Sequence, residues 1–210
     1  MTYFKFLRPG AVSPFTRYVW PVGEWVSVDA TDLCRSGFHA CALAHLPYWL
    51  GEELWEVELA APVEESRHKV VARRARLLSR VEAWTPAAAR DLGAACVART
   101  IGHAVAELAE AGLREIARRL RDAEDAEIAV AAAHCAEQAS AKGAWQAVTL
   151  CGYVSDAIEA LEAYPVASTA YIAARAADQR TTAESDDPYA AERAWQAGWL
   201  ATRLRLDRSS

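Results

Sequence analysis

The stretch AWTPAAAR, residues 83–90, separates two parts of the chain that differ in composition. A threonine followed by proline is a typical helix start, because the hydroxyl accepts a hydrogen bond from the first turn and proline suits the first helical position. Aromatic and β-branched residues with turn formers precede Trp84, whereas alanine dominates after it. The sequence therefore predicts an α+β protein, with a β-rich module at 1–84 and a helical bundle at 85–210.

Several stretches of the first half have the alternation of β-strands. In 54–59, the apolar side chains Trp55, Val57 and Leu59 point one way and two glutamates the other, as expected of a half-buried strand. We expect a small, mostly antiparallel sheet, with further strands at 2–7, 25–28, 37–41 and 69–81.

The last of these strands is strongly basic. It would carry Arg74, Arg76 and Arg80 on one face, and such a face is suited to phosphate groups. We take Arg74 and Arg76 as candidate ligand-binding residues. The alternative is a solvated face that pairs with Glu56 and Glu58 across the sheet.

The second half reads as a series of helices separated by glycine, proline and polar breaks. The periodic stripe that includes Leu150, Cys151 and Val154, and the small-residue stripe around Cys135, predict buried helix faces. Both cysteines then fill space in a core. The expected helices are 86–110, 113–120, 123–141, 144–164, 166–179 and one that begins near 187.

Bulk properties restrict the function only broadly. The net charge of −5 and the 24% of charged residues do not indicate a general nucleic-acid binder. No secretory leader and no apolar run of membrane-spanning length are recognisable, so we expect a cytoplasmic protein without membrane partners. Five cysteines in such a protein are expected to be reduced thiols.

The segment LCRSGFHAC, residues 33–41, gathers groups that could carry chemistry. Cys34, His39, Cys41 and His45 supply four potential zinc ligands, although their spacing is not that of common zinc motifs. Alternatively, His39 and Cys41 share a strand face and could act as a base and a thiolate nucleophile. The third interpretation is a buried strand, with His39 hydrogen-bonded in the core.

The helix expected at 86–110 carries a polar stripe of Cys96, Arg99, His103 and Glu107 beside an apolar one. If this stripe lines a cleft, His103 is a candidate acid or base and Arg99 a candidate anion-binding residue. The alternative is a solvent-facing stripe with a His103–Glu107 pair.

Tryptophan is frequent, with eight residues in 210, and five of them lie in the first half. Aromatic side chains bury large areas and often line apolar ligand pockets, which makes Trp55 a further candidate ligand-binding residue. Core packing explains them equally well.

The order of FKFL, CRSGFHAC and LWEVEL over residues 2–82 resembles an uncharacterised domain family of bacteriophages and actinobacteria, built around a Gly-Phe-His-Ala-Cys strand. This resemblance implies a shared fold and no specific activity. The glycine-led strand, the segment LPYW at 46–49 and the strand 54–59 are also similar in order to part of the ADP-ribosyltransferase fold, which implies NAD as a ligand. The chain lacks that fold's His-Gly-Thr or Arg-Gly start in strand 2–7 and its Ser-Thr-Ser strand.

Two functions follow as expectations. The first is a binding protein or enzyme for a small molecule such as a nucleotide, with its site in a cleft between sheet and helices near His39, Arg99 and His103. The second is a non-catalytic interaction module, which as a homo-oligomer would dimerise through its helical half. No particular cofactor is indicated.

Overall fold

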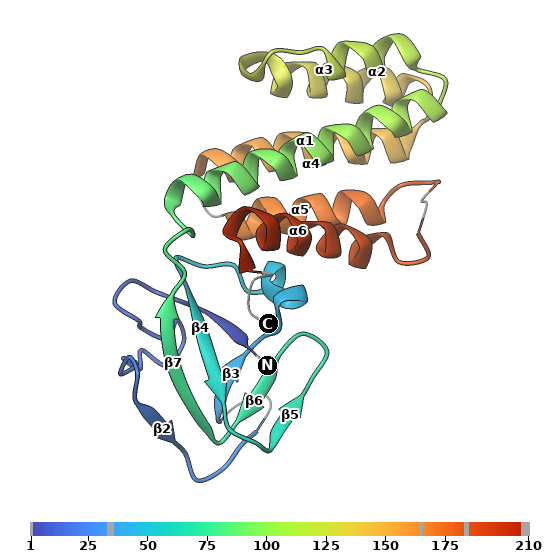
Figure 1. Cartoon of the computed structure of the whole chain (residues 1–210). Coiled ribbons are helices and arrows are strands. Elements are labelled where there is room, and N and C mark those ends of the chain that lie inside the picture. Colours follow the sequence, from blue (N-terminus) through green and yellow to red (C-terminus); the bar gives the residue numbers. More distant parts are fainter. Residues whose placement is uncertain (1, 33–35, 164–165, 183–184, 207–210) are drawn as a thin grey trace. The chain divides into compact units, whose positions relative to one another are not determined.

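The computed structural model describes residues 2–32, 36–163, 166–182 and 185–206, and it confirms the α+β class (Figure 1). Small antiparallel sheets come first in the chain and α-helices follow, as the composition change at residues 83–90 predicts. Within these residues, no helix combines the length and the apolar character needed to cross a bilayer.

The strands form what we call the sheet module. Its first sheet has the order β1-β4-β7-β2 and its second the order β3-β6-β5, and all strand pairs are antiparallel. Phe4 and Cys41 exchange backbone hydrogen bonds of 2.8 Å, which link the edge of the first sheet to the end of β3. The strands are β1 (Tyr3–Leu7), β2 (Trp25–Ser27), β3 (Phe38–Ala40), β4 (Glu53–Leu59), β5 (Val63–Glu65), β6 (Val70–Ala72) and β7 (Arg74–Arg80).

The single strand expected at 69–81 is two strands, because the chain leaves one sheet after Ala72 and enters the other at Arg74. The expected common face of Arg74, Arg76 and Arg80 is also incorrect. The pairing of β4 with β7 shifts register between Trp55 and Val57, and one extra residue in β7 reverses the alternation of side chains. Arg80 is therefore on the opposite face from the other two arginines.

One face of the first sheet encloses an apolar core. Tyr3 and Leu7 of β1 contribute to it, together with Trp20, Phe38 and Val57. The rings of Trp20 and Phe38 meet edge to face at 5.1 Å, a favourable aromatic geometry. Lys5 stands between Tyr3 and Leu7 on β1, so its side chain starts from the same face as the core residues.

The helices lie close to the expected ranges, and two of them begin at side-chain caps. Thr85 accepts a hydrogen bond of 3.1 Å from Ala88 N, and Asp187 accepts one of 2.9 Å from Ala190 N, each before a proline at the first helical position. The helices are α1 (Pro86–Glu110), α2 (Arg114–Arg121), α3 (Ile128–Ala141), α4 (Trp145–Ala163), α5 (Val166–Asp178) and α6 (Pro188–Leu204), with short 3-10 turns η1 (Leu43–Tyr48) and η2 (Asp125–Glu127).

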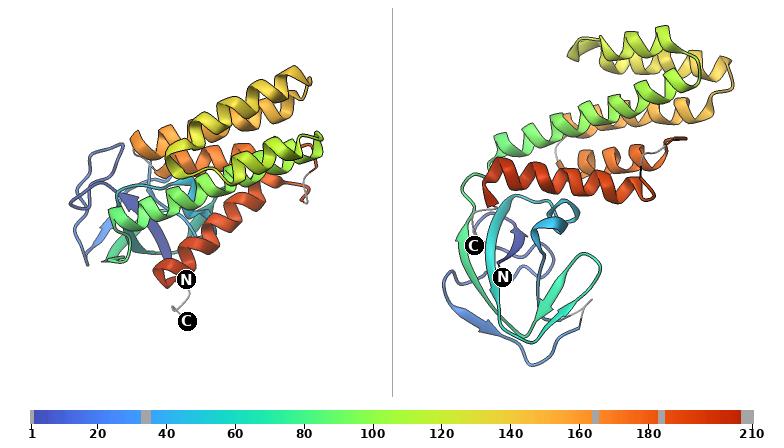
Figure 2. Two further views of the ribbon diagram at one scale, coloured as in Figure 1. Left: turned by 90° about the horizontal axis from the view of Figure 1, so that it is seen from above. Right: turned by 45° about the vertical axis from the view of Figure 1, so that its right-hand side comes forward.

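Helices α3 and α4 run side by side as a hairpin that turns at Gly143 (Figure 2). Their facing stripes are buried as predicted, with Cys135, Leu150, Cys151 and Val154 all at most 1% exposed. Both cysteines are thus part of the helical core, which also takes residues from α1 and α2.

The chain separates into two compact units. The first contains residues up to Ala89 and those from Ala194 onward, and the second, called here the helical unit, contains Arg90–Arg193. The boundary predicted from the sequence, between residues 84 and 85, lies close to the division between Ala89 and Arg90. The residues from Ala194 onward, which we expected with the other helices, are grouped with the sheet module.

Candidate ligand pocket of the helical unit

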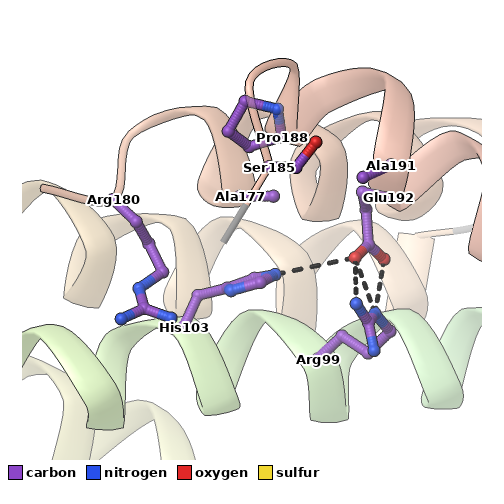
Figure 3. Close-up of a pocket in the computed structure, with 8 residues that line it drawn as sticks. All are labelled: Arg99, His103, Ala177, Arg180, Ser185, Pro188, Ala191 and Glu192. Atoms are coloured by element: carbon purple, nitrogen blue, oxygen red, sulfur yellow. Dashed lines mark hydrogen bonds and ion pairs between the residues drawn. The ribbon is translucent and has the colours of Figure 1, made fainter. Parts of the chain in front are cut away.

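The polar stripe of α1 places ionisable side chains inside the helical unit. Arg99 and His103 meet the carboxylate of Glu192, which comes from α6 (Figure 3). Only 1% of the Glu192 side chain is exposed, so this carboxylate requires close partners. Arg99 Nε donates to Glu192 Oε1 at 2.8 Å and to Oε2 at 2.6 Å, and Arg99 Nη2 lies 2.6 Å from Oε2. This forked contact fixes the carboxylate.

His103 approaches the same carboxylate without completing a hydrogen bond. Its Nε2 lies 3.6 Å from Glu192 Oε2, which is long for a hydrogen bond but suits an ion pair when the ring is protonated. The Nε2 atom is buried and has no hydrogen-bond partner in the described structure. His103 is therefore oriented by Glu192 and still has hydrogen-bonding capacity.

Arg180, which follows α5, has a similar unused group. Its Nη2 donates to Glu110 at 2.6 Å, whereas its Nε is buried and has no partner among the described residues. Only 18% of its side chain is exposed. A buried N–H without an acceptor costs about 1–3 kcal/mol, and a bound acceptor would recover this free energy.

These groups line a pocket of about 210 Å³. In Figure 3, Arg99 and His103 extend from α1, Glu192 descends from α6, and Arg180 approaches from the segment after α5. All of the lining residues belong to the helical unit: Arg99, His103, Ala177, Arg180, Ser185, Pro188, Ala191 and Glu192.

The other two residues of the polar stripe are buried. Glu107 is 5% exposed and accepts hydrogen bonds from Thr181, from the backbone N at 3.0 Å and from Oγ1 at 2.5 Å. Burial, together with the negative charge of Glu192, raises the pKa of Cys96 to about 12. The solvent-facing alternative for this stripe is therefore incorrect, since Cys96, His103 and Glu107 all turn inward and His103 meets Glu192 instead of Glu107.

The cluster around residue 39 is only partly described. Cys34 lies outside the described residues, and within them no three His, Cys, Asp or Glu side chains form a group that could hold a metal ion. His45 lies on η1 and its ring packs 5.3 Å from that of His68, whose ring stacks on Tyr48 at 3.7 Å. His39 is on β3, where its carbonyl accepts from Lys5.

Cys41 is 2% exposed, and its Sγ donates to the Phe4 carbonyl at 3.5 Å. Burial raises the pKa of this thiol to about 12, an effect that the nearby Lys5 reduces. A thiol with this pKa is protonated at neutral pH, whereas nucleophilic catalysis requires the thiolate. Of the three interpretations of this segment, the buried strand agrees best with the environment of Cys41.

The candidate residues on the sheet module are spread over both faces of its first sheet. Arg74 and Arg76 lie 5.1 and 5.2 Å from the ring of Trp25, and Arg76 forms the expected ion pair with Glu58. Trp55 is on the opposite face and donates through Nε1 to Glu53 at 3.1 Å. The structure therefore does not join Trp55 with the two arginines in one site.

Sequence reasoning did not find Glu192 or Arg180. Glu192 lies in a helix where a charged residue is normally solvated, and only its partners on α1 show that it is buried.

In comparisons with family models, curated proteins and solved structures, none matches this chain. The resemblance of residues 2–82 to the phage and actinobacterial family, and the similarity to the ADP-ribosyltransferase fold, therefore stay predictions.

Proposed function

We propose that the protein binds a small anionic molecule, with a phosphate or carboxylate group, in the pocket of the helical unit. The observation that carries this proposal is that His103 Nε2 and Arg180 Nε both line the pocket and are both buried without a hydrogen-bond partner in the described structure. Arg180 Nε–H is only a donor, so its ligand must supply an acceptor. Protonated His103 offers a second donor.

The charge of the lining supports an anion. Glu192 and Glu110 pair with Arg99 and Arg180, so that protonation of His103 gives the pocket one net positive charge. Because Glu192 already receives two donors of Arg99, it is held away from the ligand's acceptors. An oxyanion between His103 and Arg180 would then satisfy both unused nitrogens.

The size of the pocket limits the ligand. Pockets for drug-sized molecules usually measure about 300–1,000 Å³. At about 210 Å³, this pocket fits a small metabolite or the phosphate end of a larger molecule. A nucleotide, if it is the ligand, would enter with its phosphate and leave its base outside.

The same geometry supports acid–base chemistry as an extension of binding. The carboxylate of Glu192, which Arg99 holds in place, lies 3.6 Å from His103 Nε2, so that it can stabilise a proton taken up at this nitrogen. A ligand hydroxyl or ammonium beside His103 would lose its proton to Nε2. Glu192 would stabilise the imidazolium that results.

A thermal-shift experiment tests the binding proposal. The probes are inorganic phosphate, acetate, AMP and NAD, each at millimolar concentration and constant ionic strength. We expect phosphate or AMP to raise the melting temperature, because a ligand that binds only the folded state stabilises it by mass action. If none of the four probes raises it, the proposal is wrong.

Two variants locate the site. Arg180→Lys keeps the positive charge near Glu110 but removes the Nε donor, and His103→Ala removes the ring. Both are expected to lose the ligand-induced shift. The matched controls are Arg121→Lys and His134→Ala, at exposed positions on α2 and α3, and they should keep it. A shift that persists in Arg180→Lys and His103→Ala would place the ligand elsewhere and contradict the proposal.

A second candidate function is protein interaction, which exposed apolar side chains favour. Phe15, Val19 and Val22 of the sheet module are 89%, 63% and 52% exposed, and Trp145 at the start of α4 is 67% exposed. Such groups are costly to leave in water when they are contiguous. Sedimentation velocity over a tenfold concentration range tests self-association, and a constant monomer value would exclude it.

A further inference from the structure

A lysine on the inner face of the sheet module is not used by the pocket described above. The chain contains 20 arginines and only three lysines, and Lys5 stands on β1 between the core residues Tyr3 and Leu7. Its neighbour across the sheet is Trp55 of β4. Tyr3 and Leu7 are buried and Lys5 is half-buried, so that the stem of the lysine packs against the core.

The amine of Lys5 is held by weak partners. Its Nζ donates to the carbonyl oxygen of His39 at 2.6 Å and lies 5.6 Å from the centre of the Trp20 ring. Among the described residues no carboxylate forms an ion pair with it, since Glu53 on the same strand face is engaged by Arg80 and by the amide of Ala11. Both the neutral amine and the ammonium group can make these contacts, but the ammonium group has no carboxylate counter-ion among the described residues.

Electrostatics agree with this geometry. Burial lowers the pKa of Lys5 to about 8, although the nearby thiol of Cys41 raises it in part. An amine with this pKa is about a quarter neutral at pH 7.5, whereas an ordinary lysine with a pKa of about 10.4 is about 0.1% neutral. Nucleophilic lysines owe their reactivity to the same loss of hydration.

We propose that Lys5 is a covalent attachment site that forms an imine with a small, largely apolar aldehyde or ketone. The neutral Nζ adds its lone pair to the carbonyl carbon, and the nitrogen loses a proton while the carbonyl oxygen gains one, giving a carbinolamine. The hydroxyl group then leaves as water with the remaining N–H proton, and the C=N bond forms. The aromatic surroundings of Tyr3, Trp20 and Trp55 suit an apolar body on the carbonyl compound.

Reductive trapping tests this site in the full-length protein. The protein is treated with benzaldehyde and cyanoborohydride at pH 7.5, and mass spectrometry measures the modification of each lysine and of the α-amino group. We expect Lys5 to react at least about tenfold faster than Lys142, an exposed lysine after α3. In urea, the two rates should become similar. A native Lys5 rate equal to or below that of Lys142 would overturn the proposal.

Two further arms define the ligand class and the site. Glyoxylate replaces benzaldehyde as an anionic aldehyde, and the ratio of the Lys5 rate to the Lys142 rate should fall. A ratio that rises would reject the apolar ligand. Lys5→Arg, if its circular dichroism spectrum matches that of the parent, should leave the trapped adduct only at the other amines. Because this site and its readout lie in the sheet module, failure of the anion pocket does not affect the result.

Discussion

The inward position of Lys5 predicts a measurable dependence of stability on pH. The pKa of Lys5 is about 8 in the folded protein and has its ordinary value of 10.5 in the unfolded chain. The unfolded chain therefore binds the proton more tightly, and the contribution of Lys5 to stability rises with pH through this window. This contribution is complete above the pKa of Lys5 in the unfolded chain, and it is lost as the pH falls through the pKa of Lys5 in the folded protein.

The size of the effect follows from the difference in bound protons. Between pH 7 and pH 9, the unfolded chain keeps this proton while the folded protein changes from about nine-tenths to about one-tenth protonated. Integration of this difference in bound protons from pH 7 to pH 9 gives about 1, which corresponds to about 1.4 kcal/mol. The free energy of unfolding of the parent protein should thus increase by about this amount relative to that of Lys5→Met.

Urea unfolding of both proteins at pH 7 and pH 9, followed by tryptophan fluorescence, measures this difference. Burial raises the pKa values of Cys41 and Cys96 to about 12, so their ionisation in the unfolded chain lowers stability above about pH 9. The contribution of Cys96 is common to both proteins and cancels in the comparison, and Cys41→Ser in both proteins removes that of Cys41, whose pKa depends on Lys5. Lys142→Met is the matched control for the loss of a lysine. An identical pH dependence in the parent and Lys5→Met would refute the reasoning.

Substitutions at four positions test the local structure by chemical denaturation. Gly37 has φ +102° and its Cβ would lie 2.5 Å from a methyl group of Val71, so Gly37→Ala should cost about 1–3 kcal/mol, and a neutral result would argue against this backbone conformation. Gly152→Ala, at an open position in α4, should instead stabilise by about 0.5–1 kcal/mol, and a loss would indicate an unseen contact. Thr85→Ala should cost about 1 kcal/mol through loss of the cap of α1, whereas Thr85→Ser should restore it; equal values for both would exclude the cap. Glu192→Ala should cost about 1–3 kcal/mol because it removes the buried carboxylate that accepts from Arg99, and Glu192→Gln distinctly less; the reverse order would contradict the pairing with α1.

Local signals predicted most of the fold. The ends of α1 follow from Thr85 and Pro86 at one end and Gly112 after the other, and the alternation of β4 follows from its apolar and acidic residues. The sequence did not indicate β5, a three-residue strand with two glutamates whose pairing with β6 is the only sign of its structure. The division of 69–81 into two strands depends on which sheet each half joins, and no local pattern encodes this.

Only half of the candidate site was predictable from the sequence. The spacing of Arg99 and His103 on one helix marks both residues as neighbours, because the period of a helix is fixed. Their partner Glu192 comes from a segment 93 residues beyond Arg99, so that the pairing depends on tertiary structure. The same applies to Lys5, since a lysine in an alternating strand carries no local sign that its neighbours are tryptophans.

The grouping of the chain ends also has a consequence for dissection of the protein. Because residues from Ala194 onward belong with those before Ala89, Arg90–Arg193 has the character of an insertion within a discontinuous unit. A fragment that stops after Trp84 would lack a portion of its own unit, and its failure to fold would not show that the sheet depends on the helices. The informative deletion is internal, with a short flexible linker that replaces residues 90–193 and keeps both terminal portions.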